Sequence, residues 1–257
     1  MKNSIVINSA LCTGCGNCVK DCVSERLSIV EGKANFKEGI CLECGHCFAV
    51  CPSNAVEMIG YDVSDCDKTA DLAEFDSERF LLAMKSRRTI RQFKSEPVKN
   101  EDILKILEAG RYSPTAKNMQ DIHYTVITKS ISEVESYAVE IFRKLKNGAS
   151  PFSKFIANIT IDDKFFSKGA PLMIIVCGKS KTNACLASSY MELMAESLGL
   201  GVLYSGFFLA AEKLSGKIKK HIGNPNGLTP YTCLFIGHPA VSYKRTVPRK
   251  ELKVKYL

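Results

Sequence analysis

Apolar residues after position 100 recur at the spacing of an amphipathic helix. Ile103, Ile106 and Leu107 lie three or four positions apart and therefore share one face. The run begins after Asn100 and stops at Gly110, residue types that commonly begin and end helices. The same signals predict four more helices in this part of the chain: Asp76 to Lys85, one starting at Ser132, Thr182 to Leu198 before Gly199, and about Phe207 to Lys220.

The helix that starts at Ser132 carries a second local signal. Ser132 and Glu135 have the spacing of a capping box, in which each side chain bonds the backbone N–H of the other residue. We therefore expect Glu135 to close the first turn. The positions expected to face inward follow at helical spacing: Tyr137, Ala138, Ile141, Phe142 and Leu145.

Short apolar runs between the helices predict β-strands. "IHYTVIT" (122–128) reads as a strand, "PLMIIVC" (171–177) is typical of a buried strand, and "TCLFIG" (232–237) predicts the last one. A further strand is expected between Gly199 and Phe207. The order of elements predicts an α+β or α/β sheet wrapped by helices. No G-x-G-x-x-G or G-x4-G-K-[ST] motif occurs, so neither a dinucleotide fold nor a P-loop is supported.

The pattern changes before residue 76. The stretch "YDVSDCDKTADLAEF" (61–75) is acidic and poorly periodic, which predicts a linker between domains at 1–60 and 76–257. Residues 1–75 contain 6 Lys and Arg against 11 Asp and Glu, whereas residues 76–257 contain 29 against 16. The basic excess is not gathered in one long Lys/Arg run, so it does not by itself indicate nucleic-acid binding.

Composition narrows the class of protein. With 46% hydrophobic and 24% charged residues, the chain suits a folded globular protein rather than a disordered one. No apolar run approaches the roughly 18 residues of a membrane span, and "MKNSIVINSALC" lacks the apolar core of a signal peptide. We therefore expect a cytoplasmic protein without membrane contact. In that reducing compartment, twelve cysteines favour metal binding over disulfides.

Eight of the cysteines form two copies of one motif. "CTGCGNCVKDC" and "CLECGHCFAVCP" both follow C-x2-C-x2-C-x3-C, and they are 29 residues apart. Zinc sites usually take two thiolates from each of two C-x2-C knuckles. Here three thiolates of one tight loop suit three irons of a cubane, and the fourth would come from the other copy. Gly14, Gly16 and Gly45 allow the backbone to bend around a cluster.

These motifs resemble the bacterial two-cluster ferredoxin over residues 1–60, although Val23 stands where that family often repeats the proline seen at Pro52. The resemblance implies two [4Fe–4S] clusters with crossed ligation. Cys66, Cys177, Cys185 and Cys233 lie outside it, and Cys177 and Cys233 have the setting of core residues on strands. The expected ligands are Cys12, Cys15, Cys18 and Cys51 for one cluster and Cys41, Cys44, Cys47 and Cys22 for the other.

Three polar stretches in the second part are candidates for binding an anionic cofactor. "SRRTIRQF" (86–93) places three guanidiniums within five residues, which suits a phosphate as well as a solvated helix end. "SPTAKNMQ" (113–120) is a turn that would otherwise be an ordinary polar loop. "YKRTVPRKELKVK" (243–255) is either a phosphate clamp or a solvated basic tail.

The order of these stretches resembles the nitroreductase family of FMN-dependent oxidoreductases over residues 76–252. In that family an S/R-R-x-[ST]-x-R segment opens the domain, a "SP[ST]-x-x-N-x-Q" turn follows, and a basic tail ends it. "LGLGVLYSGFF" (198–208) matches the glycine-rich segment near the flavin ring. The resemblance implies an α+β fold, a central mainly antiparallel sheet wrapped by helices, and a homodimer.

The resemblance also implies roles for twelve residues around FMN. The basic residues would hold the phosphate, with Arg91 near the flavin N1/O2 position. Asn118 would meet the pyrimidine edge, and the backbone at Ser205 and Gly206 would face N5/O4. The expected contacts are Arg87, Arg88, Thr89, Arg91, Ser113, Asn118, Gln120, Ser205, Gly206, Lys244, Arg245 and Arg249.

Together the two resemblances imply an iron–sulfur flavoprotein in which clusters pass electrons to FMN. The flavin would then reduce a small electron-poor acceptor such as a nitroaromatic or a quinone, with a ferredoxin, NAD(P)H or another reductase as donor. The flavin N5 would carry the chemistry, so no side chain is assigned as catalytic. One alternative is a non-catalytic electron-transfer or redox-sensing module that serves a partner protein. The other is a nucleic-acid-binding protein with iron–sulfur clusters, which we consider less suited to the motifs.

Overall fold

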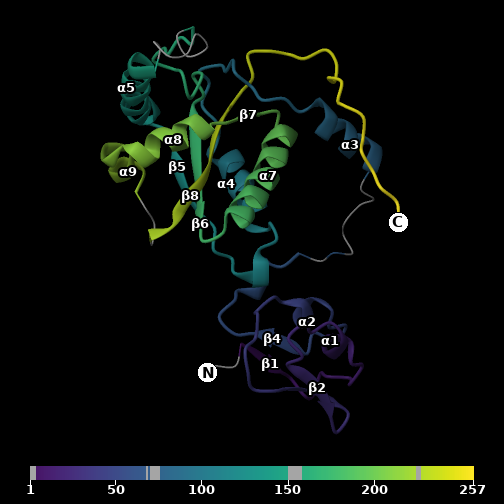
Figure 1. Cartoon of the computed structure of the whole chain (residues 1–257). Coiled ribbons are helices and arrows are strands. Elements are labelled where there is room, and N and C mark those ends of the chain that lie inside the picture. The colour runs from purple at the N-terminus through teal and green to yellow at the C-terminus, as the bar shows by residue number, and fades with distance from the viewer. Residues whose placement is uncertain (1–3, 68, 70–75, 150–157, 224–226) are drawn as a thin grey trace. The chain divides into compact units, whose positions relative to one another are not determined.

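The computed structural model describes residues 4–67, 69, 76–149, 158–223 and 227–257 (Figure 1). The chain divides into two compact units. Unit 1 consists of residues 1–74 and 115–119, and unit 2 of residues 75–114 and 120–257. The turn 115–119 therefore packs with unit 1, although sequence analysis placed it inside the second domain. In the predicted linker, η1 (Val63–Asp65) is a short 3-10 helix, while residues 68 and 70–75 lie outside the described ones.

Unit 1 is built from two antiparallel strand pairs and two short helices. β1 (Ile5–Ile7) pairs with β4 (Val56–Met58), and β2 (Leu27–Val30) pairs with β3 (Lys33–Phe36). The four-residue helices α1 (Asn17–Lys20) and α2 (His46–Ala49) start 29 residues apart, as the motif spacing does. The two copies of the cysteine motif therefore have matching helices.

Left-handed backbone positions show the repeat most clearly. Gly16 and Gly45, the residues before the two helices, have φ of 76° and 75°. Three further pairs, also 29 positions apart, share positive φ although their residue types differ. These pairs are Gly14 and Glu43 (72° and 51°), Glu25 and Asn54 (53° and 50°), and Glu31 and Gly60 (49° and 86°).

Unit 2 is centred on a four-stranded antiparallel sheet in the order β5-β6-β8-β7. Its strands are β5 (His123–Ile127), β6 (Leu172–Gly178), β7 (Gly201–Tyr204) and β8 (Thr229–Gly237). The predicted α+β class with a mainly antiparallel sheet is confirmed. All four strands fall where apolar runs predict them.

Helices cover both faces of this sheet (Figure 1). Every residue of β6 is buried, because alternate side chains enter opposite layers. Leu172, Ile174 and Val176 pack with α4 (Asn100–Arg111) and α7 (Lys181–Ser197). Met173, Ile175 and Cys177 pack toward three other helices, which are α5 (Ile131–Ala149), α8 (Gly206–Leu214) and α9 (Gly216–Ile222).

The helix predictions are correct in position, with local exceptions. Asp76 caps α3 (Ser77–Ser86) by accepting the Arg79 N–H at 3.0 Å. The predicted helix at 207–220 is two helices, because Ser215 leaves helical geometry and its hydroxyl caps α9. Leu145 is 51% exposed instead of inward.

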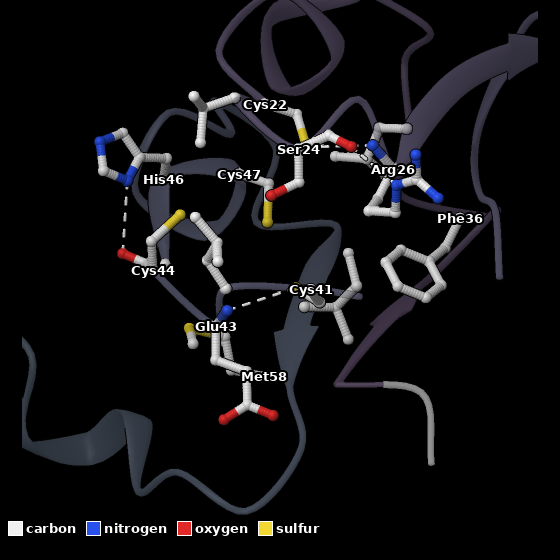
Figure 2. A pocket seen from close by; sticks show the side chains of 15 residues that line it. Cys22, Ser24, Arg26, Phe36, Cys41, Glu43, Cys44, His46, Cys47 and Met58 are labelled. Carbon is white, nitrogen blue, oxygen red and sulfur yellow. Dashed lines mark hydrogen bonds between the residues drawn. The ribbon is translucent and has the colours of Figure 1, made fainter. Parts of the chain in front are cut away.

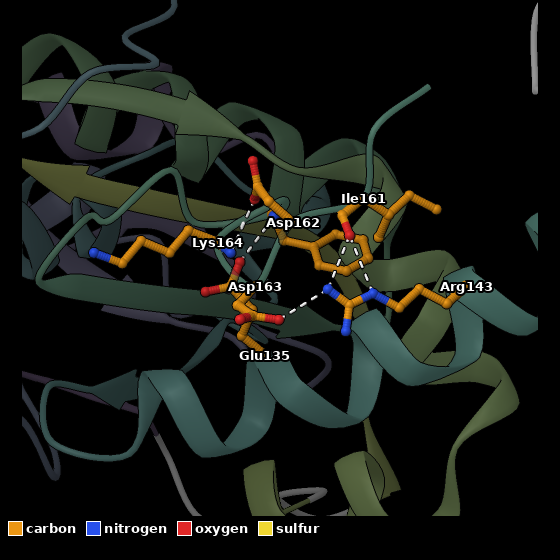
Figure 3. A network of polar contacts seen from close by, with 7 residues as sticks. Glu135, Arg143, Ile161, Asp162, Asp163 and Lys164 are labelled. Carbon is orange, nitrogen blue, oxygen red and sulfur yellow. Dashed lines mark hydrogen bonds and ion pairs between the residues drawn. The ribbon is translucent and has the colours of Figure 1, made fainter. Parts of the chain in front are cut away.

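The capping box is wrong. Glu135 is buried and accepts hydrogen bonds from the Phe166 N–H (2.8 Å), the Ser167 N–H (2.7 Å) and the Ser167 hydroxyl (2.5 Å). A second contact anchors the same segment to α5, since Arg143 donates to the Ile161 carbonyl and to Asp163 (Figure 3). Glu135 therefore stabilises a loop about thirty residues away rather than its own helix end.

Candidate functional site

The eight motif cysteines sort into two groups of four within unit 1. One cavity is lined by Cys12, Cys15, Cys18 and Cys51, and another by Cys22, Cys41, Cys44 and Cys47 (Figure 2). Each group therefore combines three cysteines of one motif copy with the last cysteine of the other copy. These are the two sets that crossed ligation of two cubanes requires.

Backbone N–H groups point at the cysteine sulfurs in both groups. Sγ of Cys22 accepts the Arg26 N–H at 3.3 Å, and Sγ of Cys51 accepts the Ala55 N–H at 3.2 Å, four residues on in both cases. Two further sulfurs, those of Cys12 and Cys41, accept the N–H groups of Ala34 and Glu43 at 3.4 Å. Such donors favour a thiolate or a sulfur bound to iron, so the surroundings fit an anionic cluster.

Burial and neighbouring charge set the acidity of these thiols. Burial raises the pKa of Cys47 to about 11, and it also raises the pKa of Cys18, with added repulsion from Cys51, Cys12 and Cys15. Burial opposes ionisation of Cys51 as well, but hydrogen bonds from Ala55 and Ser53 bring its pKa below the usual value. A metal would replace the proton on each thiol that remains protonated at neutral pH.

In unit 2 the arginine stretch lies along the edge of the sheet. Thr89 forms a parallel bridge with Val202 of β7, and the Ile90 N–H donates to the Val202 carbonyl at 3.0 Å. Further on, the N–H of Lys94 donates to the His238 carbonyl. The segment therefore pairs with β7, which leads into Gly206, and then with the residues after β8, which lead to the basic tail. In that tail Lys244, Arg245 and Arg249 are exposed.

Two predicted flavin contacts carry buried polar atoms that lack a hydrogen-bond partner among the described residues. They are Nε and Nη2 of Arg88 and the hydroxyl of Ser113. The remaining nitrogen of Arg88, Nη1, donates to the Lys85 carbonyl at 2.9 Å. Buried donors without acceptors are costly, and a ligand that supplies oxygen atoms satisfies them. These residues therefore fit an oxygen-rich anionic group such as the phosphate and ribityl part of FMN.

Arg87 is paired with an acid that sequence analysis missed. Its Nη1 lies 2.8 Å from Oε1 of Glu192 on α7, and Glu192 is 8% exposed. Burial raises the pKa of Glu192, while the Arg87 charge opposes that shift. Glu192 lies one position after Met191 on the inward face of α7, and the helical spacing of "ACLASSYMELMAES" could have revealed it. The carboxylate fixes the direction of the Arg87 guanidinium.

Two other predicted contacts are engaged elsewhere. The Ser205 N–H donates to the Cys233 carbonyl at 2.9 Å and its hydroxyl caps α8, so the expected flavin-facing N–H of Ser205 is already used. Gly206 begins α8, where the first N–H groups have no intrahelical acceptor. Asn118, expected at the flavin, belongs to unit 1, and its amide donates to the carbonyls of Leu42 (3.1 Å) and Glu43 (2.9 Å).

The remaining predicted positions are less distinctive. Arg91 and Gln120 are exposed, and Gln120 has a left-handed backbone with φ of 43°. Cys177 and Cys233 are core residues of β6 and β8 as predicted, at 2% and 1% exposure.

None of the helices in the described part of the chain combines the length and apolarity that a membrane crossing requires.

Comparisons with known proteins agree with both units. The model of the nitroreductase family matches residues 84–238, and the model of a 4Fe-4S dicluster domain matches residues 5–55. A protein of Methanothermobacter thermautotrophicus named "Putative NADH dehydrogenase/NAD(P)H nitroreductase" is 27% identical over 169 residues, covering 62% of this chain and 77% of the relative. An iodotyrosine deiodinase of Thermotoga neapolitana is 27% identical over 188 residues, covering 67% and 94%.

Solved structures show the same fold. A nitroreductase with bound FMN from Desulfitobacterium hafniense has a TM-score of 0.58 at 21% identity, covering 69% of this chain and 97% of its own. Fold and site together define an FMN-dependent oxidoreductase that carries a ferredoxin-type domain for two [4Fe–4S] clusters, as predicted. The chain belongs to the nitroreductase family.

Proposed function

We propose that this protein passes electrons from its two [4Fe–4S] clusters to FMN, which then reduces nitroaromatic, quinone or similar electron-poor acceptors. The observation that carries the proposal is the grouping of eight cysteines into two sets of four within a member of the nitroreductase family. Clusters transfer one electron at a time, whereas FMN can collect two and release them as hydride. The two kinds of cofactor therefore complement each other in one chain.

The chain's own residues would hold FMN mainly through its phosphate. Arg88 and Ser113 contribute the buried, unpartnered donors, and Arg87 is oriented by Glu192. Lys244, Arg245 and Arg249 would add cations from the exposed tail, and Thr89 would add a hydroxyl. Gly206 offers an N–H at the start of α8, and Arg91 and Gln120 would reach the ring from exposed positions. In this arrangement Asn118 and the Ser205 N–H keep their bonds within the fold.

The electron donor distinguishes two versions of the proposal. The names of the curated relatives include NAD(P)H, which favours a nicotinamide donor acting on the flavin directly. The dicluster domain favours a low-potential one-electron donor such as a free ferredoxin. We favour the second version, because the cluster domain would otherwise have no part in the reaction. We further propose a homodimer that works in the cytoplasm and acts on small molecules.

An anaerobic assay with each donor tests the proposal. The reconstituted protein is mixed with NADH, NADPH or a chemically reduced ferredoxin, and flavin bleaching and acceptor reduction are followed separately. We expect the ferredoxin to support turnover with a nitroaromatic or quinone. Flavin reduction without turnover of any such acceptor would instead identify a non-catalytic electron-transfer module. Absence of flavin reduction by every donor would overturn the electron path itself.

A further inference from the structure

The cysteine group that contains Cys51 and the group that contains Cys22 receive matching hydrogen bonds from the backbone. Among the described residues, two N–H groups point at sulfurs in each group. The shorter bond in each group comes from Arg26 or from Ala55, which lie 29 positions apart and so are equivalent in the two copies. The backbone therefore favours negative charge on both clusters to a similar degree. A difference between the clusters then depends on side chains, charge and burial.

One side chain differs between the two groups. The Ser53 hydroxyl lies 3.7 Å from Sγ of Cys51, within hydrogen-bond reach of a sulfur atom. A thiolate bound to iron has no proton to donate, so in the cluster-bound protein the hydroxyl is the donor. The equivalent serine of the first copy is Ser24, two positions after Cys22. Within the described residues, no hydrogen bond joins the Ser24 hydroxyl to a cysteine sulfur, and the Ser24 carbonyl accepts Nε of Arg26 at 2.7 Å.

The charges around the two groups also differ. Nζ of Lys33 donates to the Cys12 carbonyl at 2.6 Å, which binds a cation to the group that contains Cys51. No charged side chain is present among the described residues that line the cavity of this group. The cavity of the other group is lined by Arg26 and Glu43, which carry opposite charges, and by His46 (Figure 2). The surroundings are therefore more positive at the group that contains Cys51.

Burial acts in the opposite direction. Cys12 and Cys18 are 9% and 7% exposed, whereas all four cysteines of the other group are half-buried. A low dielectric disfavours the negative charge that reduction adds to a cluster. However, the same low dielectric strengthens a hydrogen bond to a cluster sulfur and the attraction of a nearby cation. The direct contacts from Ser53 and Lys33 therefore outweigh the cost of burial.

We propose that the two clusters differ in reduction potential, that the cluster of the group containing Cys51 has the higher one, and that the Ser53 hydroxyl raises it. Hydrogen bonds to sulfur and nearby positive charge both stabilise the reduced form of a cluster. The first electron that the protein takes up then rests on this cluster. In that step a one-electron reductant such as dithionite loses one electron, the cluster gains it, and no proton is transferred. The proposal depends on the bound clusters and not on the electron path to FMN.

Potentiometric titration of the full-length holoprotein tests the proposal. The protein is reduced stepwise with dithionite in the absence of oxygen, and the low-temperature electron paramagnetic resonance signal of the reduced clusters is measured at each potential. Ser53→Ala removes the hydroxyl near Cys51. Ser24→Ala is the matched control, because it removes a hydroxyl from the equivalent position of the other copy. Iron and labile sulfide are measured for the parent and for each variant.

We expect the parent to show two midpoint potentials, one for each cluster. Ser53→Ala should lower the higher potential by about 59 mV, a tenfold change in a one-electron equilibrium and the effect expected from one hydrogen bond. The lower potential should not change, and Ser24→Ala should leave both at the parental values. A single potential for both clusters of the parent would overturn the proposal. So would a Ser53→Ala protein in which only the lower potential falls or neither does, or an equal shift in both variants.

Lys33→Met is a second, independent variant. It removes the ammonium group bound to the Cys12 carbonyl, so it should lower the same potential as Ser53→Ala does. If Ser53→Ala binds less iron than the parent, the Lys33→Met result decides: a fall in the higher potential supports the proposed order, and an unchanged value refutes it. A parent whose clusters are reduced while its FMN is not would refute the proposed function and leave this proposal standing.

Discussion

Unit 1 buries six hydrophobic side chains among its described residues, and two of these are Cys12 and Cys18. In unit 2 a single strand, β6, contributes seven consecutive buried residues, and helices cover both of its sides. A domain of unit 1's size rarely folds on its apolar core alone and usually needs a metal or another cross-link. Unit 1 thus has a small core that includes several of its cysteines and that bound clusters would complete, whereas FMN would be added to a core that unit 2 already has.

Removing iron should produce the largest difference in stability between the two units. Metal binding supplies folding free energy where the protein cannot form its site without the metal. We expect the iron-free protein to lose hydrogen-exchange protection in β1 to β4, while β6 and β8 remain protected. Exchange followed by mass spectrometry of peptic peptides would measure both regions at once. Retained protection in β2 and β3 without iron would show that unit 1 has a sufficient core of its own.

A cavity-forming substitution in β6 should have the opposite effect, destabilising unit 2 and leaving unit 1 unchanged. Ile174 is fully buried, so Ile174→Ala should destabilise unit 2 by about 2–5 kcal/mol, through lost burial and the cavity left behind. The iron content of unit 1 should not change. Denaturant unfolding followed by FMN fluorescence measures the effect. Val126→Ala is the control, because Val126 pairs with Ile174 across the strands but is 38% exposed and should cost less.

Loss of a flavin contact should leave the fold of unit 2 intact. Arg88→Met removes a guanidinium whose Nε and Nη2 are buried without a partner among the described residues and suit the phosphate, and charge-assisted hydrogen bonds are worth about 1.5–3 kcal/mol. We expect weaker FMN binding in equilibrium titrations and unchanged far-ultraviolet circular dichroism. Arg79→Met, at an exposed arginine of α3, should bind FMN like the parent. If the Arg88→Met protein is unfolded, Arg88 is needed for the fold of unit 2 and not only for FMN binding.

The smallest effect is expected at Asp121, which joins β5 to the start of α7. Burial raises the pKa of Asp121, but hydrogen bonds from Asn183 and from the N–H groups of Lys179 and Ser180 outweigh it and leave the pKa lowered. A lowered folded pKa gives stability that is present above the usual value of 3.8 and lost as pH falls through the folded pKa.

Asp121→Asn should therefore cost unit 2 about 1–3 kcal/mol at neutral pH and weaken the loss of stability on acidification. Unfolding in urea at several pH values would test both parts. If the stability of Asp121→Asn depends on pH as the parent's does, the lowered pKa of Asp121 is not a source of that dependence. The partners that the described residues give Asp121, namely Lys179, Ser180 and Asn183, all belong to unit 2, so the iron content of unit 1 should be the same as in the parent.

Local signals predicted most of the fold. The strand at 171–177 and the helix after Asn100 were correct because periodicity and burial coincide there. Glu135 was misassigned because its true partners, Phe166 and Ser167, are 31 and 32 residues away. A capping box is a local pattern, and nothing in that pattern reports a competing contact from a distant loop.

The same distinction applies to the candidate site. The cysteine groups follow from motif spacing, and in the structure each expected set lines one cavity. The bond from Asn118 to the loop at 42–43 could not be predicted, because it depends on the left-handed turn at Lys117 and Asn118. Glu192 was recognisable as an inward position, but its pairing with Arg87 joins residues 105 positions apart.

The matched left-handed positions of unit 1 allow a comparison of glycine with a larger residue in the same backbone geometry. At Gly14 a side chain is excluded, because a Cβ there would lie 2.1 Å from the Gly32 carbonyl oxygen. At Glu43, 29 positions on, a full side chain occupies the same kind of backbone and accepts hydrogen bonds from the Ser4 and Tyr61 hydroxyls. One copy thus keeps its shape by having no side chain to accommodate, and the other by binding the one it has.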